Sequence, residues 1–367
     1  MQLLLPLELT VECSGPQVRN GSCTPLPPPA PVQVFTKGDR VAGYNPTGDA
    51  RAYQCFRIPQ LLALPSGTLL AFAEGRADGC KPDVNANRPV VVRASADEGK
   101  TWGPISIAGP ALPHVGTNYP GGFLRDGGAT VALRYLLSNG SVFETSSVDE
   151  GATWSSPVEA SQPPGGKVRC GSAWPKVLRG GDVVMTCEGG TARSSDGGRS
   201  WRLSTEPIAN MGVGESMVVA DGRSSSSLTM MIRGGGGMYN HAIARSEDGG
   251  DTWGNATQLP IVGTTNEGSI GRDALAPPGQ VLLGATSGRN KLYLGRGNMS
   301  VFSLDTRDAT AKPAAVQDVW PDAAGYSDFA QVQRGAGRLG PVLLLFEGGG
   351  SVYDYGIKIT PVAGQQN

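Results

Sequence analysis

The sequence has few aromatic residues, few charges and almost no histidine. Aromatic residues make up 6% of its 367 positions and charged residues 17%. Its two histidines are His114 and His241, and no two cysteines have CxxC spacing. A metal centre built on histidine or thiolate ligands is therefore not expected. A Ser-His-Asp triad is not expected either, because no GxSxG-like turn supports one.

Charge and hydropathy exclude two further classes of protein. The 31 basic and 32 acidic residues give a net charge of -1, and no basic block stands out. Nucleic acid is therefore not expected as a partner. No apolar stretch approaches the roughly 20 residues of a membrane span. The segment 1–9 lacks a basic n-region and Glu8 interrupts its apolar run, so it makes a poor signal peptide. A truncated gene model and a mature chain both fit this observation.

Glycine and proline are abundant instead, with 54 and 28 residues. They alternate with short apolar runs, which favours an all-β domain of short strands and tight turns. Residues 60–72 and 130–143 each predict a hairpin. A proline-rich stretch from Pro25 to Pro31 separates an N-terminal segment, 1–33, from the main domain, 34–362. We expect the N-terminal segment to be poorly ordered.

One motif, Ser-x-Asp-x-Gly-x-Ser/Thr-Trp, occurs four times. The copies are Ser95–Trp102, Ser147–Trp154, Ser194–Trp201 and Ser246–Trp253, and Ser303–Asp305 is read as a decayed fifth copy. Their spacing of roughly 50 residues is the size of one four-stranded propeller blade. The main domain is long enough for six such blades. The repeats therefore predict a six-bladed β-propeller with Asp-box (BNR) repeats.

The chemistry of the motif suits a turn rather than a site. Asp and Ser accept hydrogen bonds from nearby backbone amides, and Gly adopts a positive φ without strain. Four of the six tryptophans lie in these motifs, and we expect them to pack between blades. A metal site built from the four aspartates is not expected, because one aspartate per turn does not form a shared site.

The cysteines and the glycosylation signals bear on the compartment. The six cysteines are an even number, which permits disulfides. Cys170 and Cys187 flank a predicted hairpin near 179–182 that would place them opposite each other, and buried free thiols remain the alternative. Four Asn-x-Ser/Thr sequons give modest support for the secretory pathway: Asn20, Asn139, Asn255 and Asn298.

A second motif, Phe56-Arg57-Ile58-Pro59, lies upstream of the first repeat. Together with the repeats it resembles the sialidase (neuraminidase) superfamily of glycoside hydrolases, over residues 34 to 360. The segments 67–76 and 320–327 are most similar to the lysosomal and bacterial type. The resemblance implies an exo-α-sialidase that needs no cofactor and releases terminal sialic acid from glycoproteins, gangliosides or oligosaccharides with retention of configuration.

The resemblance also implies the binding and catalytic residues. Three arginines would hold the substrate carboxylate, because a guanidinium offers paired donors and stays charged. They are Arg57, Arg233 and Arg289, and Glu347 would orient Arg57. Tyr326 would be the nucleophile and Glu215 its base. A neutral phenol suits this role because a carboxylate would be repelled by the substrate's own carboxylate, and sialidases are a recognised exception to the two-carboxylate rule.

The general acid is implied on the segment after Ala73–Arg76. Spacing to the strand 90–93 favours Asp83, and Asp78 remains the alternative. Arg76 would contact the C4 side of the sugar or form a structural ion pair. Cys55 and Cys80 would tie the Arg57 strand to this segment as a disulfide. Trp174 would form a wall of the pocket or pack in the core.

Two other functions stay open. A glycan-binding propeller without catalysis would lack some of these residues, and all of them have a match here. A hydrolase of another ulosonic acid would use the same arginines. The resemblance points to a lysosomal or extracellular location, with the cytoplasm as the alternative. Linkage preference, pH optimum and oligomeric state are left open.

Overall fold

The structure is a computed structural model of the full chain. It describes residues 29–41, 52–81, 88–108, 117–137, 139–163, 170, 174–187, 190–205, 208, 215–234, 240–262, 266–286 and 296–363. The chain divides into two compact units, Met1–Ala30 and Pro31–Asn367. All the strands belong to the second unit. The boundary between residues 33 and 34 stays a prediction.

Four of the sheets have four strands each. The first consists of β2 (Cys55–Ala63), β3 (Leu69–Arg76), β4 (Val90–Ser95) and β5 (Ser106–Ile107). The second consists of β6 (Thr117–Arg125), β7 (Thr130–Leu137), β8 (Val142–Ser147) and β9 (Val158–Glu159), with a short 3-10 helix, η1 (Asp126–Gly128), between β6 and β7. The third consists of β10 (Lys176–Val177), β11 (Val183–Cys187), β12 (Gly190–Ser194) and β13 (Arg202–Leu203). The fourth consists of β14 (Ser216–Ala220), β15 (Leu228–Ile232), β16 (Asn240–Ser246) and β17 (Thr257–Val262).

The remaining strands form one seven-stranded sheet, in the order β1-β23-β22-β21-β20-β19-β18. Its strands are β1 (Val32–Phe35), β18 (Ser269–Gly271), β19 (Gln280–Thr286), β20 (Gly297–Asp305), β21 (Ala314–Gln333), β22 (Leu339–Gly349) and β23 (Tyr355–Pro361). All pairings in the five sheets are antiparallel, including the two predicted hairpins, β2 with β3 and β7 with β8.

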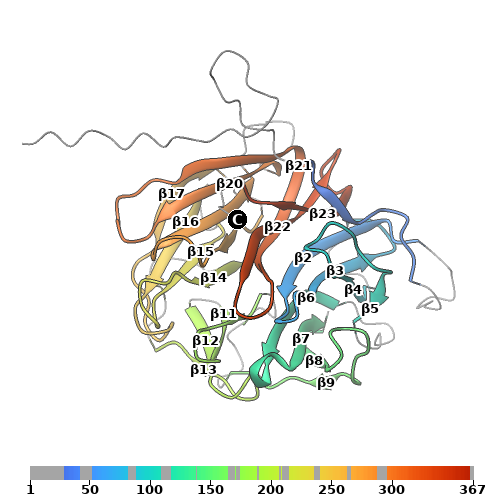
Figure 1. Ribbon diagram of the computed structural model, residues 1–367, viewed down its shortest axis with the longest axis horizontal. Helices are drawn as coiled ribbons and strands as arrows, with labels where there is room; N and C mark the ends of the chain where they lie inside the picture. The colour runs from blue at the N-terminus through green and yellow to red at the C-terminus, as the bar shows by residue number, and fades with distance from the viewer. Residues whose placement is uncertain are drawn as a thin grey trace, which may run out of the picture. The chain divides into compact units, whose positions relative to one another are not determined.

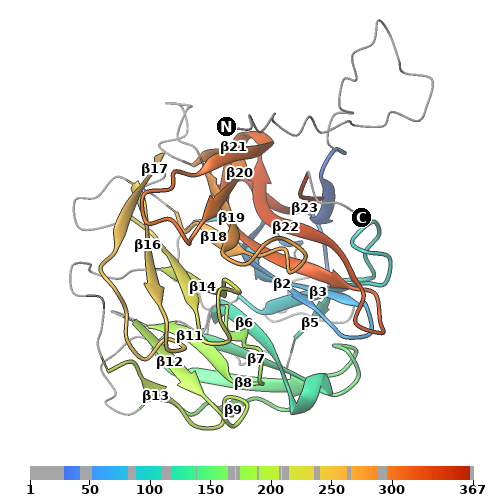
Figure 2. The same ribbon diagram turned by 60° about the vertical axis from the view of Figure 1, so that its left-hand side comes forward.

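The sheets have a propeller-like arrangement. In Figure 1, β2, β6 and β14 lie towards the middle, and the last strands of their sheets, β5, β9 and β17, lie outside. Figure 2 shows β2, β6 and β14 near one another from a second direction. Contacts between β2 and β6, β6 and β10, β11 and β14, β14 and β18, and β21 and β2 link each sheet to the next and close the ring. The predicted all-β class and propeller-like arrangement are therefore confirmed.

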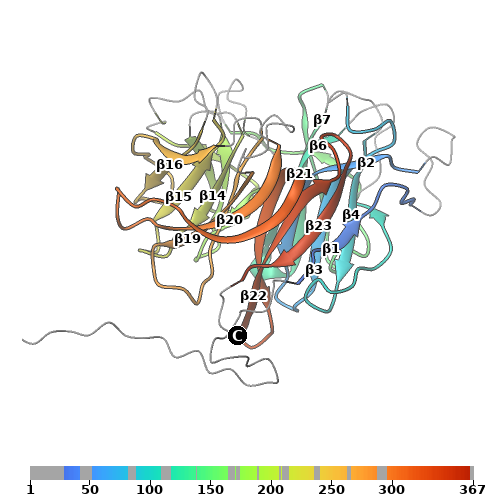
Figure 3. The ribbon, with the colours of Figure 1, turned by 90° about the horizontal axis from the view of Figure 1, so that it is seen from above.

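The prediction of six separate blades is wrong, because the described strands form five sheets. The part of the sequence expected to form the last two blades joins β1 in the seven-stranded sheet. Within this sheet, the 20-residue strand β21 changes its partner strand along its length. The first part of β21, up to Ala323, pairs with β20, and the part from Ala323 onward pairs with β22. Pro321 lies at a shift of register in this strand, a position where a missing N–H is tolerated. Figure 3 shows β21 between β20 and the β22–β23 pair.

The four repeated motifs form the same turn. In the second copy the Oγ of Ser147 accepts the N–H of Gly151 at 2.8 Å, and Oδ1 of Asp149 accepts the N–H of Thr153 at 2.8 Å. The indole of Trp154 donates to the carbonyl of Gly151 at 3.1 Å. The matching bonds recur in the other three copies. Each motif therefore satisfies its own polar groups and closes a hairpin.

The tryptophans of the motifs join neighbouring sheets. Trp154 follows β8 and meets Phe72 of β3 edge to face, with ring centroids 5.9 Å apart. Trp253 packs in a cluster that also contains Val184 of β11 and Met230 of β15. Apolar surface is thus buried between sheets as well as within them, and this holds the ring of sheets together.

Two disulfides are present, Cys55–Cys80 and Cys170–Cys187. Both pairings agree with the sequence prediction, and the free-thiol alternative is wrong for these four cysteines. No helix in the described part of the chain has the length and apolar character that a membrane crossing requires.

Candidate active site

The Phe56–Pro59 motif places Arg57 beside Glu347. Arg57 lies on β2, where the pairing with β3 is irregular between Arg57 and Gln60. Nε of Arg57 donates to Oε1 of Glu347 at 3.1 Å, and the N–H of Ile58 donates to the same oxygen at 2.8 Å. Both side chains are buried. The charge of Arg57 is therefore compensated and its guanidinium is held in one orientation.

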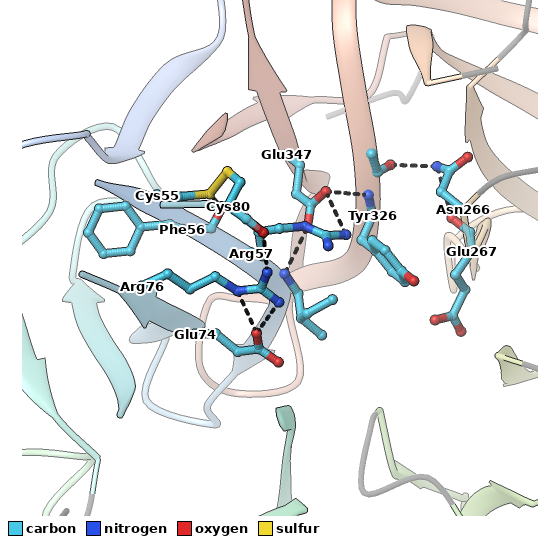
Figure 4. A network of polar contacts seen from close by, with 12 residues as sticks. Cys55, Phe56, Arg57, Glu74, Arg76, Cys80, Asn266, Glu267, Tyr326 and Glu347 are labelled. Carbon is cyan, nitrogen blue, oxygen red and sulfur yellow. Dashed lines mark hydrogen bonds and ion pairs between the residues drawn. A yellow bond between two sulfur atoms is a disulfide. The ribbon is translucent and has the colours of Figure 1, made fainter. Parts of the chain in front are cut away.

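Glu347 also fixes the backbone at Tyr326. Its Oε2 accepts the N–H of Tyr326 at 3.2 Å, as Figure 4 shows. A Cβ on Gly325 would collide with this oxygen, so only glycine allows β21 to come so close to Glu347. The guanidinium carbon of Arg57 lies 5.0 Å from the centre of the Tyr326 ring. One carboxylate thus sets the positions of both Arg57 and Tyr326.

The hydroxyl of Tyr326 meets Glu215, which precedes β14. It donates to Oε2 of Glu215 at 2.5 Å. Arg233, just after β15, donates from Nη1 to the same carboxylate oxygen, and its Nη1 lies 3.3 Å from the Tyr326 hydroxyl. A second phenol, that of Tyr119 on β6, donates to Oε1 of Glu215 at 2.7 Å. Three side chains from separate parts of the chain therefore converge on the Glu215 carboxylate.

The environment of Tyr326 keeps its phenol protonated at rest. Only 3% of the residue is exposed. Burial raises the pKa of Tyr326 well above its ordinary value, and the negative charge of Glu215 raises it further. The phenol therefore loses its proton only as an acceptor takes it, and Glu215 is already in hydrogen-bond contact.

Trp174 packs against Tyr326 in the core. The two rings are nearly parallel, 12° apart, with centroids at 6.3 Å. The indole N–H of Trp174 donates to the carbonyl of Pro59 at 3.0 Å, and the residue is 2% exposed. The structure therefore favours the core role of Trp174 over the pocket-wall role.

Arg76 forms a buried ion pair with Glu74. Its Nε and Nη2 donate to Oε2 of Glu74 at 3.0 and 2.6 Å, and its Nη1 donates to the carbonyl of Cys80 at 2.6 Å. The Cys55–Cys80 disulfide lies beside this pair in Figure 4. Oε1 of Glu74 accepts the N–H of Tyr119 at 3.0 Å. The ion-pair alternative for Arg76 is therefore present, and it is connected to the Glu215 cluster through Tyr119.

Known proteins resemble this chain in sequence and in fold. No protein-family model matches it. A sialidase of Micromonospora viridifaciens is 24% identical over 282 residues, which are 66% of this chain and 42% of that protein. The chain thus spans less than half the length of that relative. A Trypanosoma rangeli sialidase in complex with the inhibitor DANA superposes with a TM-score of 0.69 at 15% identity, over 92% of this chain and 60% of that one. The NanB sialidase of Streptococcus pneumoniae superposes with a TM-score of 0.70 at 13% identity, over 89% of this chain and 70% of that one.

The predicted resemblance to the sialidase superfamily is confirmed.

Among the predicted sialidase site residues, five come together in the described structure: Arg57, Arg233, Glu215, Tyr326 and Glu347. Arg289 and Asp83 lie outside the described residues. Asp78 is exposed in the turn after β3. The choice between Asp83 and Asp78 as general acid therefore stays a prediction.

Arg296 lies at this site and sequence reasoning missed it. Its guanidinium carbon is 5.8 Å from the ring centre of Tyr326 and 5.4 Å from that of Tyr353. Its carbonyl accepts the N–H of Ala324 at 3.1 Å, so the pairing of β20 with β21 brings it beside Tyr326. The sequence shows only that Arg296 directly precedes a strand, which begins at Gly297. It does not show that this strand pairs with β21, which is what brings Arg296 to the site.

Glu267 is a second residue that sequence reasoning missed. It is 1% exposed, and neither carboxylate oxygen has a hydrogen-bond partner among the described residues. The neighbouring Asn266 donates to the carbonyl of Gly325 at 3.0 Å, which places Glu267 close to Tyr326 in Figure 4. Burial raises the pKa of Glu267 well above its ordinary value, and the charge of Glu215 adds to the rise. The site thus contains a buried carboxyl group whose surroundings favour its protonated form.

No cluster of three or more His, Cys, Asp or Glu side chains suitable for a metal ion occurs in the described part of the chain.

Proposed function

We propose that the protein is an exo-α-sialidase that hydrolyses terminal sialic acid with retention of configuration. The hydrogen bond from Tyr326 to Glu215, with the Arg57 guanidinium held near the Tyr326 ring, carries the proposal. This arrangement pairs a neutral nucleophile with a base and places cationic groups around both. The relatives named above are sialidases, which supports the same assignment.

The substrate would be held by its carboxylate. Sialic acid carries this group on the anomeric carbon, so the cations must lie beside the nucleophile. Arg57 contacts the Glu347 carboxylate and Arg233 contacts that of Glu215, and both guanidinium groups lie beside Tyr326. Arg296 also lies by the Tyr326 ring, and we assign it as the third arginine in place of Arg289. Guanidinium groups suit this task because they bind carboxylates with paired, charged donors.

The reaction would proceed in two displacements. In the first, Asp83 gives a proton to the glycosidic oxygen as the anomeric C–O bond breaks, the Tyr326 oxygen bonds to the anomeric carbon, and Glu215 accepts the phenol proton. In the second, water attacks the anomeric carbon and gives a proton to Asp83, the bond to Tyr326 breaks, and Glu215 returns its proton. Two inversions at one carbon give net retention. No cofactor is required.

The natural substrates would be sialylated glycoproteins, gangliosides or oligosaccharides met in the secretory pathway, in lysosomes or outside the cell. Disulfides form and persist in the secretory pathway and outside the cell, and the described part of the chain holds two.

A release assay tests the proposal. The purified protein is incubated with fluorogenic α-glycosides of N-acetylneuraminic acid and of its deaminated analogue across a range of pH. We expect release from the first glycoside, and Tyr326→Phe should abolish turnover while thermal denaturation shows an intact fold. Tyr135→Phe on β7 is the matched control, because Tyr135 is equally buried and lies in a different core cluster.

Other outcomes have definite meanings. Binding of sialyl-lactose without release would establish the glycan-binding propeller instead. Release from the deaminated glycoside alone would establish a hydrolase of another ulosonic acid. An NMR time course identifies the first-formed anomer, and β-configured free sugar as the first product would overturn the retaining mechanism.

A further inference from the structure

Glu215 is bound by two phenols, of which the proposed reaction uses one. Oε2 accepts the hydroxyl of Tyr326 at 2.5 Å, and Oε1 accepts the hydroxyl of Tyr119 at 2.7 Å. Tyr119 comes from β6 and Tyr326 from β21, so the two donors reach the carboxylate from different sheets. The role of the Tyr119 hydroxyl remains to be explained.

The backbone at Tyr119 is bent in a costly way. Its φ is 53°, a left-handed conformation that a bulky residue rarely adopts. The pairing of β6 with β7 shifts register between Asn118 and Gly121, and such a bulge redirects the side chain at its apex. Residues kept in sparsely populated conformations are concentrated at functional sites. The unusual backbone conformation therefore accompanies the orientation of the Tyr119 side chain towards Glu215.

A buried carboxylate holds this bend in place. Oε1 of Glu74 accepts the N–H of Tyr119 at 3.0 Å. Glu74 is 1% exposed, and its other oxygen is occupied by Arg76. The position of Tyr119 is therefore set from the first sheet, independently of Glu215.

The charges around Tyr119 make it a donor. Burial raises the pKa of Tyr119, and the charge of Glu215 raises it further. The phenol therefore keeps its proton and donates a hydrogen bond to the Glu215 carboxylate.

We propose that Tyr119 is a positioning residue for the reaction: its hydroxyl holds Oε1 of Glu215 so that Oε2 faces Tyr326 and receives its proton. This rests on the proposed function, because the roles of Glu215 and Tyr326 do. The hydrogen bond is strongest while Glu215 is ionised, since charged acceptors bind donors more tightly than neutral ones. Tyr119 therefore orients the carboxylate of Glu215.

Tyr119→Phe tests the inference, because it removes one oxygen and keeps the ring. We expect kcat to fall about tenfold and KM to change by less than about threefold, because Tyr119 acts on the base and not on the arginines. A merely structural role would lower the melting temperature and would not separate kcat from KM in this way. Tyr135→Phe is the control and should leave both kcat and KM unchanged.

The outcomes separate the inference from the proposed function. If the wild-type protein releases no sialic acid, the proposed function fails and the inference falls with it. If the wild type is active and Tyr119→Phe keeps the wild-type kcat, the inference alone is overturned. Thermal denaturation of each variant checks that the comparison is made between folded proteins.

Discussion

Arg57 and Glu347 form a buried ion pair, with Nε of the arginine 3.1 Å from Oε1 of the glutamate and side-chain exposures of 3% and 0%. The two residues come from β2 and β22, which are far apart in the sequence. Desolvating two charges is costly, so such a pair persists only with good geometry and further hydrogen bonds. The N–H groups of Ile58 and Tyr326 supply those bonds.

Glu347→Gln should therefore destabilise the fold severely. The amide keeps the size of the side chain but removes the negative charge that faces buried Arg57, and breaking a buried ion pair costs about 3–5 kcal/mol. Urea denaturation measures the loss. The control is Asp354→Asn, which breaks the exposed Lys37–Asp354 pair and should cost less than about 1 kcal/mol. Equal losses of unfolding free energy in the two variants would show that the buried Arg57–Glu347 pair contributes no more to stability than the exposed pair.

Local features of the fold could be predicted from the sequence, and long-range ones could not. The turn of each repeated motif is built from residues within eight positions, so Ser147, Asp149 and Gly151 bond to one another as the motif suggests. The junction in β21 depends on which strand lies beside Pro321, and no local pattern gives that. The six-blade count therefore failed where the chain continues one strand into a second set of partners.

The residues of the candidate site also fall into two groups, those that a local motif predicts and those that only tertiary contacts place. Arg57, Tyr326 and Glu215 lie in recognisable short motifs, and the resemblance identified them. Arg296 and Glu267 have no such motif. Their place beside Tyr326 follows from the pairing of β20 with β21 and from the Asn266–Gly325 bond. Those are tertiary contacts, which only the folded chain shows.

Glu267 should make the fold less stable as the pH rises. Its pKa is raised in the folded state by burial and by Glu215, above the ordinary value of 4.5. Below pH 4.5 both the folded and the unfolded chain hold the proton. Above it the unfolded chain releases the proton while the folded chain keeps it, so unfolding becomes easier by up to about 1.4 kcal/mol per pH unit. The effect ends where the folded-state group itself ionises.

Glu267→Gln removes this dependence. The stability of the variant relative to the wild type should grow as the pH rises from about 4.5 to 7. Urea denaturation at several pH values measures it, with Glu159→Gln as the control, because Glu159 is exposed on β9. Parallel curves for Glu267→Gln and the wild type would mean that Glu267 is ionised in the folded protein.

Removal of either disulfide should lower stability by a similar amount, but the two removals should differ in their effect on activity. Cys55–Cys80 spans 25 residues and Cys170–Cys187 spans 17. Loop-closure entropy depends only weakly on these lengths, so replacing either pair by serines should cost about 3 kcal/mol. Cys55–Cys80 is linked to the site by a direct hydrogen bond, because the carbonyl of Cys80 accepts from Arg76. Removal of that pair alone should therefore lower kcat/KM for a sialic acid glycoside. The same loss of kcat/KM in both double variants, measured well below their melting temperatures, would contradict this.

A comparison of Arg296 with Arg289 decides which is the third arginine of the site. Arg296 lies 5.8 Å from the Tyr326 ring, so Arg296→Lys should remove a paired donor from the substrate carboxylate. A hydrogen bond between charged groups contributes about 1.5–3 kcal/mol, and kcat/KM for a fluorogenic sialoside should fall by about 10- to 100-fold. Arg289→Lys, the matched variant, should leave kcat/KM within about threefold of the wild type. The reverse pattern would restore Arg289 to the site. Equal losses would place both arginines on the substrate, since each lysine keeps the positive charge and only the paired geometry of the guanidinium is lost.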